Sequence, residues 1–483
     1  MHKKTSPFKK GQLIELEIKD AAFGGKGISK IKTPNGDFVF FVLNTIPGQK
    51  VLAKIDKLKK NYGECKLVEI ISPASDEQKV PYQKISGAPF ITLPIQIQKQ
   101  YKLKTSLELY KRIGKITHPE NLFETYISSP KSFHYRNKME YAFSAIGFDI
   151  EKKQEFDGFA LGFKKRGTWW IVENLNKDSG MFDKTFEDKL IQLRAYFINT
   201  GLPAWHPPKK TGFYRHLIVR KSHASNQLLI KLVTSSTNIE RFDKKNFVEK
   251  LLALYGDRIA GVLHTINDDI GDNAHNRMGK DELLYGNSVI QENLLGLSFE
   301  MSMESFFQTN PSSAELLYQK ALDYLLLENE FKKTDVILDL FCGTGTITQL
   351  VAKKTGLKVI GVDIVEEAIN NAKENAKSNN IDSASFYALD VKKFLMEFPE
   401  FKDNINSIIL DPPRAGIAPK ALKRVIDLNA QRIVYISCNP ATQARDTEIL
   451  MQNNYEPVKL SLVDQFPHTA HIESVVLFKK SVR

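Results

Sequence analysis

The hydrophobic pattern divides the chain into three stretches of different character. In the first, residues 13–71, short runs such as "LIELEIKD" and "DFVFFVL" alternate apolar and polar positions, and "FGGKG" and "IPGQ" interrupt them. Alternation with a period of two predicts strands that bury one face, and glycine-rich interruptions predict tight turns. We therefore expect residues 1–72 to form a small barrel of antiparallel strands.

The middle stretch mixes helical and strand-like patterns. After a turn-rich gap, apolar residues such as Leu103 and Leu107 recur at helical spacing, which predicts an amphipathic helix over residues 97–116. Four strand-like runs follow, "YRNKMEYAFSAIGF", "FYRHLIVRKS", "QLLIKLVTSS" and "GVLHTIND", with a helical run near residues 182–199. This order predicts a central α+β domain over residues 73–290, whose first helix can pack on the domain that follows.

The last third changes character again. Its strand-like runs, "DVILDLF", "KVIGVDIV", "ASFYALDV", "SIILDPP" and "RIVYISC", are apolar and rich in β-branched residues. Helical stretches such as "EEAINNAKENAKSN" separate most of them. Strands that are buried on both faces and connected through helices form parallel sheets. Residues 291–483 are therefore predicted to form a doubly wound α/β domain.

Chemically informative residues follow the strands of this domain, where such folds bind their ligands. After the first strand comes "DLFCGTGTIT", in which Gly343 and Gly345 allow a tight turn. Asp363, after the second strand, stands 20 residues beyond Gly343, and Asp390 follows the third. A plain strand-to-helix turn would explain the glycines alone, but an acidic residue at this spacing reaches ribose hydroxyls. Taken together, the pattern predicts a nucleoside cofactor.

The fourth and fifth strands end in two further signals. The fourth is followed by "DPPRAG", whose prolines prevent it from continuing, and the fifth by "SCNP", which contains Cys438. A cysteine here is either a packing residue or a nucleophile, and its place beside the expected cofactor favours the nucleophile. We expect Cys342 to pack against the cofactor and Cys65 to lie in the core of the barrel.

Charge is concentrated at the amino-terminal end. The 483-residue chain carries a net charge of +12, and residues 1–72 contribute +7 through 14 Lys, no Arg and 7 Asp or Glu. From residue 335 onwards, 18 basic residues balance 18 acidic ones. A basic module joined to a neutral one is typical of proteins that bind a polyanion, although a solvated surface would carry the same charge.

Composition also restricts the class of protein. No apolar run approaches the roughly 20 residues of a membrane span, and the basic start "MHKKTSPFKKGQ" lacks the apolar segment of a signal peptide. We expect a cytoplasmic protein that does not associate with a membrane. The three cysteines are far apart, which argues against a disulfide framework.

Several of these motifs together resemble a known enzyme family. "FFQTNP", "DLFCGTGT", "DPPRAG", "YISCNP" and "FPHTAHIESV" are similar to motifs of the S-adenosylmethionine-dependent RNA (uracil-5-)-methyltransferases, in particular the 23S ribosomal RNA branch. Residues 10–71, with "FGGKGISKI", resemble the TRAM domain of that branch. The resemblance implies a Rossmann-like class I methyltransferase fold at the carboxyl terminus and an OB-like TRAM barrel at the amino terminus.

The resemblance also assigns roles. It implies S-adenosylmethionine as the cofactor, Cys438 as the nucleophile that adds to C6 of uracil, and Glu473 as the base that removes the C5 proton. Residue pattern alone would make Glu473 a surface carboxylate and would allow His468 or His471 as the base. The residues implied around the cofactor and the target base are Gln308, Phe341, Gly343, Gly345, Asp363, Asp390 and Asp411. Arg414 is a candidate for lowering the pKa of the thiol.

One segment departs from the family pattern. Many members hold an iron-sulfur cluster through four cysteines, in a region that corresponds to residues 80–98. Here that region reads "VPYQKISGAPFITLPIQIQ" and contains no cysteine, so we expect no cluster and no metal. We expect packing of Phe90, Ile91, Leu93 and Ile95 to take its place.

RNA is the expected partner, because a uridine must leave its stack to expose C5 and C6. Basic and aromatic residues of the middle stretch are expected to face the RNA and offset that cost: Arg136, Lys138, Lys164, Lys165, Arg166, Arg215, Arg220, Tyr135, Trp169, Trp170 and Tyr214. Bacterial transfer-RNA members generally lack the TRAM module, so we expect 23S ribosomal RNA as the target, with transfer RNA as the alternative. We also expect a monomer.

Two other functions stay open at this point. A non-catalytic RNA-binding or ribosome-assembly factor would keep the fold without the chemistry, but the presence of both Cys438 and Glu473 argues against it. A methyltransferase acting on a nitrogen atom would use "DPPR" and would leave Cys438 without a role.

Overall fold

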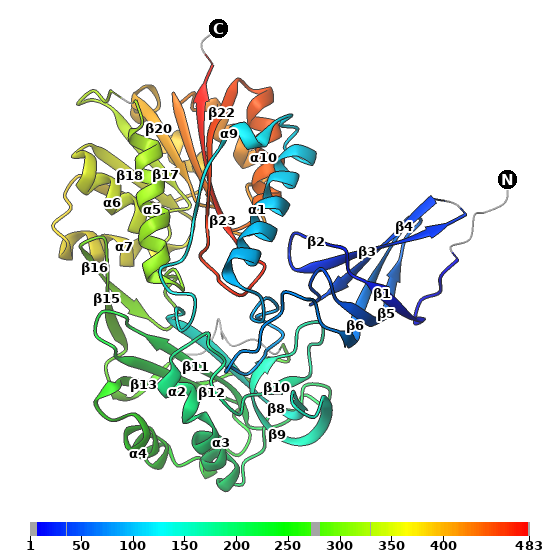
Figure 1. The fold of residues 1–483 in the computed structure, drawn as a ribbon. Helices are drawn as coiled ribbons and strands as arrows, with labels where there is room; N and C mark the ends of the chain where they lie inside the picture. Colours follow the sequence, from blue (N-terminus) through cyan, green and yellow to red (C-terminus); the bar gives the residue numbers. More distant parts are fainter. Residues whose placement is uncertain (1–6, 35, 272–280, 329, 482–483) are drawn as a thin grey trace.

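The computed structural model describes residues 7–34, 36–271, 281–328 and 330–481. Residues 1–6 and 35 of the expected barrel, and residues 272–280 of the expected central domain, lie outside this part of the chain. Three large sheets follow one another along the sequence (Figure 1). In Figure 1 the C-terminal sheet lies above the central one, and the N-terminal sheet projects beside the junction between them.

The first sheet, which with its flanking residues 7–72 is called the N-terminal module below, has its own core. Its strands are β1 (Leu13–Glu17), β2 (Asp20–Ala22), β3 (Lys26–Thr33), β4 (Gly36–Leu43), β5 (Lys50–Leu58) and β6 (Tyr62–Ser72). Their order is β1-β5-β6-β4-β3-β2, and β4 and β6 pair in parallel, which the sequence did not predict. Alternate residues of β4, Phe38, Phe40 and Val42, point into the core, and Cys65 lies with them as expected.

The central sheet has seven strands in the order β10-β9-β8-β11-β12-β13-β14. They are β8 (Lys138–Asp149), β9 (Gln154–Lys164), β10 (Val172–Asn174), β11 (Tyr214–Lys221), β12 (Leu228–Thr234), β13 (Ile259–Ile266) and β14 (Glu282–Gly286). The associated helices are α2 (Lys184–Asp188), α3 (Leu190–Asn199) and α4 (Lys244–Tyr255), with 3-10 turns η2 (Ile239–Arg241) and η3 (Gly256–Arg258). The helix expected near residues 182–199 is therefore divided in two, with a break at Lys189.

The C-terminal sheet has eight strands in the order β19-β18-β17-β20-β21-β23-β22-β7. They are β7 (Phe123–Ile127), β17 (Val336–Leu340), β18 (Lys358–Asp363), β19 (Ala384–Ala388), β20 (Ile405–Leu410), β21 (Arg432–Ser437), β22 (Tyr455–Val463) and β23 (Glu473–Lys480). The strands from β19 to β21 in this order run parallel, and β23 lies antiparallel between β21 and β22. The doubly wound sheet predicted from the sequence is confirmed.

Helices cover both faces of this sheet. They are α5 (Pro311–Leu326), α6 (Thr346–Thr355), α7 (Glu366–Ser378), α8 (Val391–Glu397), α9 (Pro419–Asp427) and α10 (Pro440–Gln452), with the 3-10 turn η4 (Pro399–Asn404). Successive residues of β17 enter opposite cores, because Ile337 packs in one and Val336 and Leu338 in the other. Burial on both faces explains why these strands read as continuous apolar runs.

Two segments cross the boundaries that the sequence suggested. Helix α1 (Ile95–Arg112) packs against α10, and after the turn η1 (Pro119–Asn121) strand β7 pairs in parallel with β22. Residues 95–127 therefore belong to the C-terminal sheet, although the sequence pattern groups them with the central domain. The hairpin of β15 (Val289–Leu294) and β16 (Leu297–Ser302) shares one core with both the central and the C-terminal sheet.

The N-terminal module docks through the turn between β2 and β3. Gly25 in this turn has a left-handed backbone, with φ of 75°, and a Cβ placed on it would lie 2.9 Å from the Cβ of Ala470. The Arg166 guanidinium donates to the carbonyl of Gly24 at 2.7 Å and to Asn44 Oδ1 at 3.1 Å. The glycine-rich signature thus permits a close contact between the module and the loop that precedes β23.

Replacing Gly25 by alanine should loosen this junction. The added methyl group would collide with Ala470 and the residue would keep a left-handed backbone, so we expect the free energy of unfolding to fall by about 2–4 kcal/mol. Gly24 is the matched control, because its φ is 86° but no atom lies within 4 Å of the place a Cβ would take. Thermal unfolding of Gly24→Ala should show only the backbone strain, and equal losses in both variants would contradict the docking role of Gly25.

Candidate active site

A cavity of about 1060 Å³ lies at the carboxyl ends of the parallel strands. The strand order reverses between β17 and β20, which is where folds of this type bind ligands. Seven of the nine residues to which the family resemblance assigns a catalytic or cofactor-binding role line it: Gln308, Phe341, Gly343, Asp363, Asp411, Cys438 and Glu473. Motifs that are far apart in the chain are therefore brought together in one place.

Two glycines of the turn after β17 have different tasks. Gly343 and Gly345 have left-handed backbones, with φ of 53° and 74°. No atom lies within 4 Å of the place where a Cβ of Gly343 would stand, whereas a Cβ on Gly345 would lie 2.5 Å from the ring of Phe386. Gly343 keeps the cavity open to the backbone, and Gly345 lets the turn pack on β19.

Asp363 and Asp411 line the cavity on either side of β17: Asp363 is the last residue of β18, and Asp411 directly follows β20. The carboxylate of Asp363 accepts the backbone N–H groups of Gly343 and Val365, each at 3.0 Å, and so joins the ends of β17 and β18. Each carboxylate oxygen keeps a lone pair for a ligand. Asp411 follows β20, and burial raises its pKa to about 7.

Asp390 is used differently from the sequence expectation. Its carboxylate accepts the N–H groups of Lys392 and Lys393 and caps helix α8, and it is not among the residues that line the cavity. Sequence reasoning also missed Ile364, which lines the cavity and is 75% exposed. An apolar residue directly after a strand-terminal aspartate was the signal that could have revealed it.

The two residues proposed for catalysis lie at the ends of adjacent strands, because Cys438 directly follows β21 and Glu473 is the first residue of β23. The antiparallel register of β21 and β23 pairs Ser437 with Ser474, the residues next to Cys438 and Glu473, and the charge of Glu473 acts on the Cys438 thiol. Both residues line the cavity, so the thiol and the carboxyl group face one ligand site.

Burial and like charges control the ionisation of this pair. Burial and then the charge of Glu473 raise the pKa of Cys438 to about 11, while Arg414 acts in the opposite direction. Burial and then Asp411 raise the pKa of Glu473 well above its ordinary value, and Arg414 again opposes the shift. Arg414 is thus the cation that the sequence suggested, but it does not outweigh burial.

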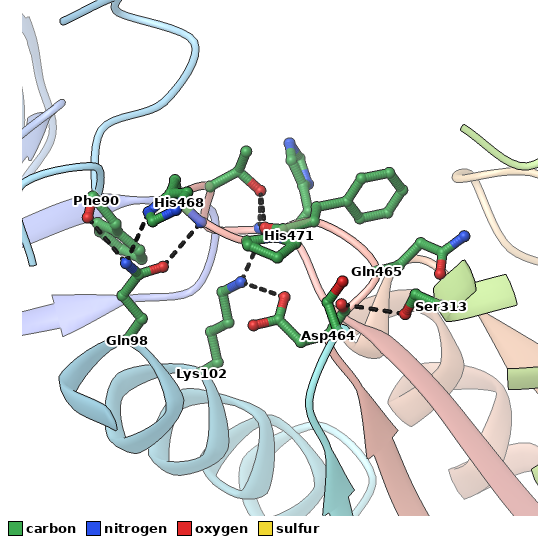
Figure 2. Close-up of polar contacts among 12 residues, drawn as sticks. Phe90, Gln98, Lys102, Ser313, Asp464, Gln465, His468 and His471 are labelled. Atoms are coloured by element: carbon green, nitrogen blue, oxygen red, sulfur yellow. Dashed lines mark hydrogen bonds and ion pairs between the residues drawn. The ribbon is translucent and has the colours of Figure 1, made fainter. Parts of the chain in front are cut away.

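The two histidines near Glu473 have different surroundings. His471 lines the cavity, and burial lowers its pKa to about 4. His468 is 2% exposed, stacks on Phe133 with ring centroids 4.2 Å apart, and faces the side chain of Gln98 (Figure 2). Of these two alternatives for the base, His471 reaches the cavity and His468 does not.

The residues expected to face RNA divide into two groups. Arg136 lines the cavity and Trp169 is 58% exposed. In contrast, the fully buried members are Tyr135, Tyr214, Arg215 and Arg220. The prediction is wrong for these four. The reason for those on β11 is that cores cover both faces of this strand, with Leu217 in one core and Ile218 in the other.

Comparisons with known proteins identify the family of this chain. The sequence model of the family described as tRNA (Uracil-5-)-methyltransferase matches residues 276–481, and that of the TRAM domain matches residues 7–68. An uncharacterized RNA methyltransferase of Clostridium acetobutylicum is 38% identical over 478 residues, which cover 98% of this chain and 99% of the relative. One of Caldanaerobacter subterraneus is 36% identical over 476 residues, 98% of this chain and all of the relative. This chain belongs to the RNA (uracil-5-)-methyltransferase family.

A solved structure supports the fold of this methyltransferase. The tRNA (uracil-54, C5)-methyltransferase of Pyrococcus abyssi, in complex with S-adenosyl-L-homocysteine, superposes with a TM-score of 0.69. It is 24% identical and covers 96% of this chain and 100% of its own. The similarity therefore extends over the N-terminal, central and C-terminal sheets.

The region of the methyltransferase without cysteines is held by packing. Phe90, Ile91 and Leu93 are 3–4% exposed, and Ile95 is partly buried.

Among the described residues, no group of three or more His, Cys, Asp or Glu side chains is placed to hold a metal ion. Within the same part of the chain, no helix is both long and apolar enough to cross a membrane.

The reactivity of Cys438 should respond in opposite directions to its two charged neighbours. Removing the negative charge with Glu473→Gln should lower the pKa of the thiol and speed its alkylation by iodoacetamide at pH 8 by about threefold to tenfold. Arg414→Gln should raise that pKa and slow the reaction by a similar factor. Mass spectrometry assigns the modified cysteine, and Cys65 in the module core serves as the internal control. Slower alkylation in Glu473→Gln would contradict the electrostatic account.

Proposed function

We propose that this methyltransferase moves a methyl group from S-adenosylmethionine to C5 of a uridine in RNA, through a covalent bond between Cys438 and C6 of the base. The observation that carries the proposal is that Cys438, directly after β21, and Glu473, at the start of the neighbouring β23, line one cavity. A methyltransferase acting on a nitrogen atom needs neither a nucleophilic thiol nor a base that removes a proton from carbon. A non-catalytic RNA-binding factor would have no use for the pair.

The cavity fits the cofactor together with a base. Its volume of about 1060 Å³ is at the upper end of the roughly 300–1,000 Å³ of ligand pockets. In this proposal, Asp363 accepts hydrogen bonds from the ribose hydroxyls of the cofactor, and Ile364 packs on its adenine ring. Gly343 has no side chain and so lets the cofactor approach the backbone. Gln308, Phe341 and Asp411 complete the wall. When bound, S-adenosylmethionine supplies an electrophilic methyl group on a sulfonium sulfur.

The first task of the protein is to activate C5 of uracil. Addition of the Cys438 thiolate to C6 forms the S–C6 bond and moves the electron pair of the C5–C6 double bond onto C5 and O4. The electron pair on C5 then forms the bond to the methyl group, and the electron pair of the broken sulfur–methyl bond stays on the sulfur. Arg414 favours the thiolate. So does the amino-terminal end of α10, which begins at Pro440 just after the cysteine.

The second task is to remove the C5 proton. The Glu473 carboxylate accepts it, the C5–C6 double bond forms again, and the S–C6 bond breaks to return the thiolate. Because the charge of Glu473 raises the pKa of Cys438, the thiolate forms most readily while Glu473 is protonated. In the adduct the sulfur carries no charge, so Glu473 can then ionise and act as the base.

The proposed target is 23S ribosomal RNA, with the chain acting in the cytoplasm as a monomer. The support is the TRAM module, which bacterial transfer-RNA members generally lack, together with the charge of +7 over residues 1–72. Transfer RNA is the second candidate, because the Pyrococcus abyssi tRNA enzyme matches 96% of this chain. We assign residues 1–72 to RNA anchoring, residues 73–290 to the RNA-facing surface and residues 291–483 to the chemistry.

Substitutions of the two catalytic residues should stop the reaction at different points. Cys438→Ala removes the nucleophile, so methylation of RNA should fall by about a thousandfold or more without any covalent complex. Glu473→Gln cannot accept the C5 proton, so it should accumulate a methylated protein–RNA adduct that survives denaturation. Denaturing electrophoresis with labelled RNA, followed by mass spectrometry of the modified peptide, distinguishes the two outcomes.

The control for this experiment is Cys342→Ala, which removes the other thiol of the cavity and should still allow an adduct to form. Formation of 5-methyluridine by Cys438→Ala would show that the mechanism is wrong. Turnover of Glu473→Gln close to the wild-type rate would show that another group, such as His471, takes the proton.

The N-terminal module should account for part of the salt dependence of RNA binding. Lys30 and Lys32 are exposed on β3. Each phosphate contact to single-stranded RNA contributes about 0.7 to the slope of log affinity against log salt, so changing both to Gln should lower the slope by up to about 1.4. Lys373 and Lys377 on α7 are the matched exposed pair. A larger change in this second pair would contradict the anchoring role.

A further inference from the structure

The most buried face of helix α1 is polar. Its buried residues recur at every fourth position and are Gln98, Lys102, Ser106 and Tyr110. Leu103 and Leu107, which the sequence pattern assigns to the apolar face, are only partly buried. Burying polar groups costs free energy unless each one finds a partner. The partners of this polar stripe therefore indicate what the helix holds.

Lys102 holds the start of the loop that connects β22 to β23. Its ammonium group donates to Asp464 Oδ1 at 2.7 Å and to the carbonyl of Phe466 at 3.0 Å (Figure 2). The side chains of Lys102 and Asp464 are 1% and 3% exposed. Tyr126 donates to the other oxygen of Asp464 at 3.0 Å. Such a buried ion pair contributes little net stability, because desolvation offsets the attraction, but it demands a defined geometry.

Gln98 holds the middle of the same loop. Its amide nitrogen donates to the carbonyls of Phe90 and Leu93 at 3.1 and 2.8 Å and lies 3.0 Å from His468 Nδ1. Its amide oxygen accepts the backbone N–H of His468 at 2.8 Å, and the N–H of Phe90 donates to the carbonyl of His468 at 3.0 Å. His468 has a left-handed backbone with φ of 65°, which these contacts stabilise.

Tyr110, at the other end of the stripe, reaches the strands beside the catalytic pair. Its hydroxyl donates to Gln443 Oε1, which also accepts from the hydroxyl of Ser474 at 2.6 Å. Ser474 follows Glu473 directly, and its paired residue on β21 is Ser437, which precedes Cys438. The stripe thus contacts both ends of the segment that carries Glu473.

The loop held in this way, residues 464–472, forms part of the cavity wall. Phe466, Thr469 and His471 line the cavity, and the loop leads directly into Glu473. The loop contains no helix or strand, so its shape depends on contacts with other segments. Gln98 and Lys102 supply the contacts from α1, and Gly25 of the N-terminal module meets it at Ala470.

We propose that Gln98 and Lys102 are positioning residues of the methyl-transfer site, which fix loop 464–472 so that Glu473 faces Cys438. This role rests on the proposed function. Neither side chain lines the cavity, so each acts through the loop. The helix α1 is in this view a support for the catalytic strands, and its polar stripe sets the register between the loop and the cavity.

The test uses full-length variants with controls from the same helix. Lys102→Met and Gln98→Leu remove the two contacts while keeping side chains of similar size. Lys104→Met and Gln100→Leu are the matched controls, because Lys104 forms an exposed ion pair with Asp20 and Gln100 is exposed. The double variant Lys102→Met with Asp464→Asn removes the carboxylate charge that Lys102→Met alone would leave buried and unpaired.

Two readouts separate positioning from stability. In Lys102→Met, Gln98→Leu and the double variant, kcat should fall about tenfold or more, while KM for S-adenosylmethionine changes by about twofold or less. Displacement of Glu473 should also lower the pKa of Cys438, so iodoacetamide should alkylate this thiol faster at pH 8. The controls should match the wild-type protein in both measurements.

The double variant decides the question even if Lys102→Met alone fails to fold. Low kcat and faster alkylation in the folded double variant support the positioning role. Wild-type kcat and wild-type alkylation in that variant would overturn it and leave the ion pair as a stability feature. Absence of 5-methyluridine formation by the wild-type protein would instead refute the proposed function, and the alkylation rates would still test the position of Glu473.

Discussion

The active site depends on the antiparallel contact between β21 and β23. This pairing brings the ends of the two strands together, so that the thiol of Cys438 and the carboxyl group of Glu473 line one cavity. Burial and the charge of Glu473 both raise the pKa of Cys438, so the pair favours at most one negative charge. This restriction sets the order of steps in the proposed reaction. The thiolate must form first, and the carboxylate must act after the sulfur has bonded to C6 and lost its charge.

The rest of the fold provides the conditions for this contact. Parallel strands deliver Gly343, Asp363, Asp411 and Cys438 to one edge of the sheet, as any doubly wound fold does. Glu473 arrives from the opposite direction, because β23 is inserted antiparallel beside β21. The loop before β23 therefore has to be fixed from outside the sheet, and helix α1 and the N-terminal module both contact it.

A small apolar cluster connects the N-terminal module to the loop that precedes β23. The segment from residue 79 to residue 98 and helix α1 connect the module to the catalytic sheet along the chain. The cluster of Ile46, Phe90, Leu93 and Ala470 joins the module, this segment and the catalytic loop in space. A shift of the module on binding RNA would therefore change the contacts of the loop that carries His471 and leads to Glu473.

Short sequence motifs predicted the cavity well, because each one sits in a loop at a strand end and parallel strands end at the same edge. The sequence located Cys438, Gly343, Asp363 and Asp411 in this way. It could not show that Asp390 serves as a helix cap, because capping and ligand binding use the same carboxylate. It also predicted an RNA-facing role for Arg220, whose strand is covered on both faces by segments distant in sequence.

Helix α1 illustrates a different limit. Its leucines recur at helical spacing, so periodicity selects them as the buried face, but tertiary contacts bury the polar stripe instead. Nothing local to the helix shows that Asp464 and His468, more than 360 residues away, supply the partners. The place of β7 in the C-terminal sheet could not be predicted for the same reason, since its partner β22 lies far along the chain.

The most direct measurement is a map of 5-methyluridine in ribosomal and transfer RNA from cells that lack this protein. The proposed function predicts that a 5-methyluridine of 23S ribosomal RNA is lost, that the wild-type gene restores it, and that a gene encoding Cys438→Ala does not. Loss from transfer RNA instead would correct the target and keep the chemistry. An unchanged 5-methyluridine content in both RNA classes, or restoration by Cys438→Ala, would contradict the central claim.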